Sequence, residues 1–80
     1  MQNLIEMRTE HLGLVKLRIP TVGEAIDIMD LPKKEQAIKM AAMALVEPNL
    51  TEEDIRRLPM THLEDITRIV ARVSGDGADA

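Results

Sequence analysis

The spacing of apolar residues changes near Pro20. Within residues 14–19, the apolar Val15, Leu17 and Ile19 alternate with the basic Lys16 and Arg18, which is the two-residue period of a β-strand. We therefore predict a short strand or extended arm there, ended by the proline because it lacks the N–H group of a strand ladder. Residues 2–10 either pair with this strand as a hairpin, through a turn at residues 10–13, or form a helical turn. The hairpin is the favoured interpretation.

After Pro20 the spacing becomes that of a helix. Thr21 and Glu24 have the spacing of a capping box, in which the hydroxyl and the carboxylate each bind an unpaired backbone N–H. One apolar stripe follows at helical spacing, made of Val22, Ala25, Ile26 and Met29. The sequence Asp30-Leu31-Pro32 closes this predicted helix.

The second predicted helix covers residues 33–46. It begins with charged residues and becomes apolar on nearly every side over residues 40–46. Such a helix is usually central in a fold or lies in an interface. Because so small a domain has little surface with which to cover it, we predict that part of this helix is covered by another copy of the chain or by a helix of a partner protein.

Two further helix starts are separated by Leu58-Pro59. Thr51 and the three acidic residues after it suit the positive end of a short helix that lasts to about Arg57. Thr61 and Glu64 repeat the signal, so we predict that Thr61 caps the last helix. The apolar stripe of that helix consists of Leu63, Ile66, Ile69, Val70 and Val73.

These elements predict a mainly α fold, a small domain of about four helices with a short N-terminal strand or hairpin arm. The expected organisation is an arm over residues 1–20, a helical domain over residues 21–73 and a disordered tail over residues 74–80. The tail is predicted from its small and polar residues.

Composition narrows the functional classes. The 80 residues include no Cys, Phe, Tyr or Trp, so disulfides, thiolate metal sites and cysteine nucleophiles are excluded and the core must be thin. With 14 acidic against 10 basic residues and a net charge of −4, nucleic acid is a poor candidate partner. The N-terminus lacks the pattern of a secretory signal, and the longest apolar run of seven residues is far below the ~20 that cross a bilayer. We expect a cytoplasmic protein without a membrane partner.

Candidate catalytic and metal-binding residues have simpler explanations. His11 and His62 lie in different predicted elements, with no ligand-type residue at helical spacing from either. Adjacent carboxylates at residues 52–54 diverge around a helix and suit capping. The acidic tail lacks a complete calcium loop, and Ser74 lacks the context of a nucleophile. We therefore expect no enzyme activity, no catalytic residue, no metal and no cofactor.

The six methionines allow two interpretations. Methionine fills irregular gaps in a core without aromatic rings, and it also suits surfaces that adapt to a partner. If the second interpretation holds, the partner-binding residues are Met29, Met40, Met43, Val46 and Met60.

Three segments together resemble the small tail assembly chaperones of long-tailed bacteriophages and prophages. They are Leu17-Arg18-Ile19-Pro20-Thr21 entering the first helix, the apolar middle helix at residues 40–46, and Leu58-Pro59 followed by Leu63-Glu64-Asp65. The resemblance covers roughly residues 14–73. It implies a non-enzymatic factor of the bacterial cytoplasm that binds the tape-measure protein, helps to recruit tail-tube subunits and is absent from the mature virion. It also implies that a longer form made by ribosomal frameshifting can exist.

Two other classes remain open from the sequence. One is a small structural or adaptor protein of a phage tail or another complex. The other is a regulator, such as an antitoxin-like or DNA-associated helical domain.

Overall fold

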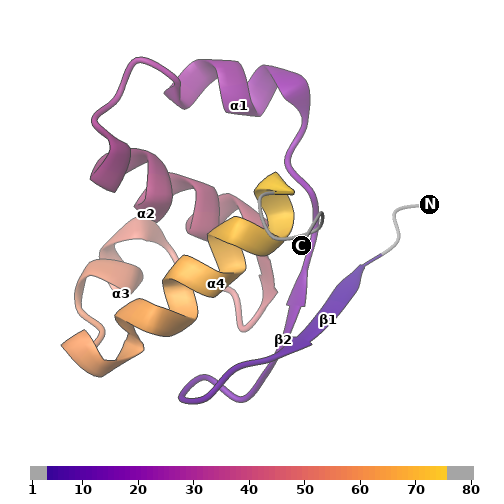
Figure 1. Ribbon diagram of the computed structural model, residues 1–80, viewed down its shortest axis with the longest axis vertical. Helices are drawn as coiled ribbons and strands as arrows, with labels where there is room; N and C mark the ends of the chain where they lie inside the picture. Colours follow the sequence, from indigo (N-terminus) through magenta and orange to yellow (C-terminus); the bar gives the residue numbers. More distant parts are fainter. Residues whose placement is uncertain (1–3, 76–80) are drawn as a thin grey trace.

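The computed structural model describes residues 4–75 (Figure 1). The strands are β1 (Ile5–Arg8), β2 (Leu14–Leu17) and β3 (Leu45–Glu47). The helices are α1 (Val22–Ile28), α2 (Lys33–Ala44), α3 (Glu52–Arg56) and α4 (Leu63–Ser74), with a 3₁₀ turn, η1 (Met60–His62), leading into α4.

The mainly α class predicted from the sequence is wrong. The chain is a mixed α/β domain, because four helices pack with a three-stranded antiparallel sheet of order β1-β2-β3, and 54% of the described residues are helical, η1 included. The third strand was missed because the apolar run at residues 40–46 has no period that separates helix from strand. In the structure α2 stops at Ala44, whose carbonyl accepts the Arg18 N–H at 2.9 Å, and Leu45 continues as a strand beside Leu17.

The predicted N-terminal hairpin is confirmed. Strand β1 pairs antiparallel with β2, with Ile5 opposite Leu17 and Arg8 opposite Leu14. The turn closes where the Thr9 N–H donates to the Gly13 carbonyl at 2.7 Å. Gly13 adopts a φ of 76°, a conformation that glycine reaches without steric cost. Thus the arm is an integral part of the sheet.

The core lies between the sheet and helices α2 and α4. Its buried side chains come from every strand or helix except β1 and α1, and they are Val15, Leu17, Ala41, Ala44, Leu45, Ile55, Ile66, Ile69 and Val73. Helix α2 packs against α4, α3, α1 and β3, so most of its apolar surface is covered within this chain. No helix among residues 4–75 is long and apolar enough to cross a membrane.

The apolar stripe predicted on the first helix forms, but it faces solvent. Val22, Ile26 and Met29 are 77%, 57% and 66% exposed. Instead, Ile28, which lies off the stripe, is the residue of α1 that is buried. Figure 1 shows α1 at the top of the molecule, set apart from the sheet.

The capping predictions have mixed outcomes. The capping box predicted at Thr21 forms with Glu24, and Thr51 caps α3 as predicted, with Asp54 completing a box that was not predicted. The predicted cap at Thr61 is wrong, because Thr61 lies within η1 and the chain passes from this turn into α4 without a side-chain cap. The structure describes only the start of the predicted disordered tail. Ser74 belongs to α4, and residues 76–80 lie outside the described residues.

Candidate functional site

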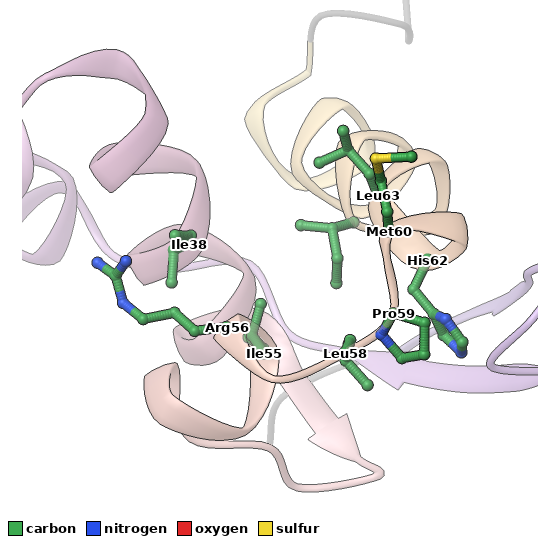
Figure 2. Close-up of a pocket in the computed structure, with 9 residues that line it drawn as sticks. Ile38, Ile55, Arg56, Leu58, Pro59, Met60, His62 and Leu63 are labelled. Atoms are coloured by element: carbon green, nitrogen blue, oxygen red, sulfur yellow. The ribbon is translucent and has the colours of Figure 1, made fainter.

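A hollow lined mainly by apolar side chains lies where the chain turns from α3 into α4 (Figure 2). We call it the corner hollow; its volume is about 200 Å³, and it is lined by Ile38, Ile55, Arg56, Leu58, Pro59, Met60, His62, Leu63 and Ile66. The turn is held by two backbone bonds, from the Leu58 N–H to Ile55 at 3.1 Å and from the His62 N–H to Pro59 at 2.9 Å. Since Pro59 is extended, with ψ of 153°, the chain changes direction there and the two helices diverge around the hollow.

The mouth of the corner hollow is apolar. Ile55 and Ile66 are buried at its base, whereas Met60 and Leu63 are 85% and 63% exposed. Arg56 is the charged lining residue, and its guanidinium is paired with Glu35 on α2. In Figure 2 the Arg56 side chain extends away from Met60. The hollow therefore presents mainly apolar contact surface, with Arg56 and His62 as the polar residues of its lining.

A second set of exposed apolar side chains lies on α1 and on the segment that leads into it from β2. We call it the α1 stripe and define it as Ile19, Val22, Ile26 and Met29, each more than half exposed. Its start is fixed by Arg18, which binds both carboxylate oxygens of Glu24 at 2.9 and 2.8 Å. This contact and the N–H of Thr21 lower the pKa of Glu24 to about 2, so the carboxylate stays charged at neutral pH. The stripe is thus an exposed apolar face on a helix whose first turn is held by the Arg18–Glu24 ion pair.

The predicted partner-binding residues do not form a single groove. Met29 belongs to the α1 stripe, Met60 stands at the mouth of the corner hollow, and Val46 is exposed on β3. Met40 and Met43 are half-buried neighbours on α2 that line different hollows. Met40 lies beside Val70 of α4, and Met43 lines a hollow with Ile28 and Leu50. Among the described residues, Met40, Met43 and Met60 line three separate hollows.

Sequence reasoning missed Asp65, which is 1% exposed. Its carboxylate accepts the N–H groups of Glu10, His11 and Leu12 at 3.3, 2.8 and 2.9 Å, tying the hairpin turn to α4. The available signal was its spacing: Asp65 precedes the buried Ile69 and Val73 by four and eight residues, on one face of the helix. An acid on an apolar face predicts a buried carboxylate with donors of its own.

The two histidines, predicted to lie in separate elements, are neighbours in space. The ring centres of His11 and His62 are 5.2 Å apart, and Nδ1 of His11 lies 3.7 Å from Asp65. No group of three or more His, Asp or Glu side chains within residues 4–75 is placed to hold a metal ion. Asp65 already accepts backbone N–H groups of the hairpin turn, so holding this turn against α4 explains why the three side chains lie together.

Comparison of the chain with protein-family models, with curated proteins and with solved structures gave no match.

Proposed function

We propose that this chain is a non-enzymatic assembly chaperone for the tail of a long-tailed bacteriophage. It acts in the bacterial cytoplasm, binds the tape-measure protein, helps to recruit tail-tube subunits and leaves before the virion is mature. The proposal starts from the resemblance of residues 17–21, 40–46 and 58–65 to that family.

The observation that carries the proposal is the α1 stripe. Monomeric proteins rarely leave an ordered row of large apolar side chains in water, and such surfaces commonly mark contacts with other proteins. A row at helical spacing is suited to pack against the apolar face of another helix. A long, helical tape-measure protein requires such cover before assembly.

Co-expression with the tape-measure protein of the same phage tests this proposal. Ile26→Glu places a charge on the α1 stripe, where binding would have to remove its water. We expect the variant to keep the circular dichroism and thermal midpoint of the parent chain, because Ile26 is 57% exposed, but to lose co-purification with the tape-measure protein. Thr67→Glu, which adds the same charge at an exposed site on α4, is the matched control and should bind normally.

Met60→Glu tests the corner hollow in the same assay, since Met60 stands at its mouth and is 85% exposed. If both Ile26→Glu and Met60→Glu bind the tape-measure protein as the parent does, neither apolar surface holds it and the proposal fails.

Purified virions provide a separate test. A chaperone should be absent from them by mass spectrometry, whereas a structural adaptor should be present in a fixed ratio to the tail-tube protein. Finding the chain in that fixed ratio would replace the proposal by the adaptor function.

A further inference from the structure

Strand β1 leaves one edge of the sheet open. The order β1-β2-β3 places β1 and β3 at the two edges, and Figure 1 shows no helix or strand of residues 4–75 beyond β1. The β3 edge is short, since the strand has three residues and is followed by Pro48, which has no N–H to donate. An open edge carries backbone groups that can pair with another strand.

The hydrogen bonds of the sheet show which residues of β1 direct their backbone outward. In an antiparallel pair, bonded and non-bonded positions alternate along the strand. The Thr9 N–H points to β2, where it donates to Gly13, so Met7 and Ile5 also direct their backbone toward β2. Glu6 and Arg8 therefore direct their N–H and C=O groups to the open edge.

The hydrogen bonds on the side of β2 that faces β3 follow the same alternation. The Arg18 N–H points away from β1 and donates to Ala44, so the neighbouring Leu17 points toward β1, opposite Ile5.

The two residues whose backbone faces the open edge are also the charged residues of β1. Glu6 and Arg8 flank Met7, are exposed and take part in no ion pair within the described part of the chain. Their order along the strand is self-complementary. If a second copy of β1 runs antiparallel with Met7 opposite Met7, each Glu6 lies opposite an Arg8, twice by symmetry.

We propose that β1 pairs with β1 of a second copy of this chain, antiparallel about a two-fold axis at Met7, to form a continuous six-stranded sheet. In this register Glu6 and Arg8 of the two copies exchange both backbone hydrogen bonds, so the outward N–H groups and the opposite charges are satisfied together. Registers centred on Glu6 or Arg8 place like charges opposite each other and are disfavoured. The inner faces meet at Ile5 and Met7, which are half-buried in one copy.

The expected dimer is weak. The paired strand has four residues, so the buried area falls well below the ~1,600 Å² of a standard interface, and we expect a dissociation constant on the order of 0.1–1 mM. Sedimentation equilibrium between about 20 μM and 2 mM covers this range.

Charge reversal tests the register. Glu6→Arg and Arg8→Glu should each be monomeric at concentrations where the parent dimerises, because each places two like pairs across the axis. An equal mixture of the two variants should form heterodimers, since all four charges are then matched. Asp27→Arg, an equal change of charge on α1, should dimerise as the parent does.

A backbone variant supports the test independently of charge. Glu6→Pro removes an outward N–H and leaves the bonds from Ile5 and Met7 to β2, so it should stay folded by circular dichroism and lose dimerisation. Arg8 lies opposite the uncharged Leu14 across the hairpin, so Arg8→Glu should also fold. If Glu6→Arg does not fold, Arg8→Glu alone tests the role of charge in dimerisation.

Three results would overturn the proposal: a parent chain that is monomeric at 2 mM, an Arg8→Glu variant that associates as the parent does, or a mixture that stays monomeric. The test uses no tape-measure protein, so its outcome is independent of the proposed chaperone function.

Discussion

At the scale of single residues, Asp65 is the polar side chain on which the packing of the hairpin depends. Its charged carboxylate accepts three backbone N–H groups of the turn between β1 and β2. Asp65→Asn keeps the size of the side chain but presents an amide N–H to those donors. Hydrogen bonds to a charged group contribute about 1.5–3 kcal/mol, so we expect the free energy of unfolding to fall by roughly 2 kcal/mol.

Urea denaturation measures this loss, and Glu64→Gln is the control because Glu64 is adjacent and exposed. Equal unfolding midpoints for Asp65→Asn and the parent would show that the turn is held by other contacts.

The same carboxylate predicts how stability depends on pH. Burial by itself raises the pKa of Asp65, but the N–H groups of His11, Leu12 and Glu10 more than compensate and hold its pKa below the usual value. As the pH falls below about 4, the unfolded chain takes up a proton before the folded chain does. The contribution of Asp65 is therefore complete above that pH and is lost as the pH falls through the folded-state pKa.

The measurement is the urea midpoint of the parent and of Asp65→Asn between pH 6 and pH 2. Glu24 and Asp54, whose pKa values are also lowered, remain in both proteins, so the comparison isolates Asp65. The difference between the two midpoints should shrink on acidification; a constant difference would contradict the linkage.

At the scale of elements, two similar sequence signals, at Thr51 and at Thr61, have different structural outcomes. The Thr51 hydroxyl accepts the Asp54 N–H at 3.1 Å, so Thr51→Ala should cost about 1 kcal/mol in denaturation. Thr61 lies in η1, and its hydroxyl, exposed and 3.4 Å from Nδ1 of His62, caps no helix. Thr61→Ala should therefore change the unfolding free energy by only a few tenths of a kcal/mol. Equal losses at the two sites would mean that the last helix begins at Thr61 in solution.

The elements also show how far the sequence predicts this fold. The strand predicted within residues 14–19 and the caps predicted at Thr21 and Thr51 depend on neighbours in sequence, and β2 (Leu14–Leu17) and both caps form. Strand β3 depends on pairing with Leu17, 28 residues earlier, and no local pattern contains that contact. Periodicity predicts that α1 has one apolar face, but the direction of that face follows from which side chain, Ile28, finds space beside α2.

The candidate site was predictable only in part. Met29 and Met60 were predicted as binding residues and are exposed, in agreement with a surface role that the binding experiments test. Met40 and Met43 were chosen because residues 40–46 are apolar on every side. These apolar side chains are covered within the chain, since α2 is surrounded by α1, α3, α4 and β3. Asp65 was missed because its donors lie more than 50 residues away in the chain.

At the scale of the whole molecule, α1 is attached less firmly than the rest of the fold. Its main contact is with α2, its single buried side chain is Ile28, and its stripe faces solvent. The other helices share one core with the sheet. Parts of a protein with few buried contacts open locally, at a lower free energy than global unfolding. We therefore predict that α1 opens and closes while the sheet, α2 and α4 stay folded.

Hydrogen exchange measures this opening residue by residue. The Ala25 N–H, which bonds to Thr21, should exchange with a smaller free energy than the N–H groups of the buried Ala41 and Ile69. Ile28→Ala removes most of the buried contact of α1 and should speed exchange at Ala25 by about tenfold or more, with little effect at Ile69. Ile69→Ala is the converse control, because it weakens the shared core and should speed exchange at both positions. Should Ala25 and Ile69 exchange with the same free energy in the parent chain, α1 would unfold only with the whole domain, and the α1 stripe would be a rigid surface.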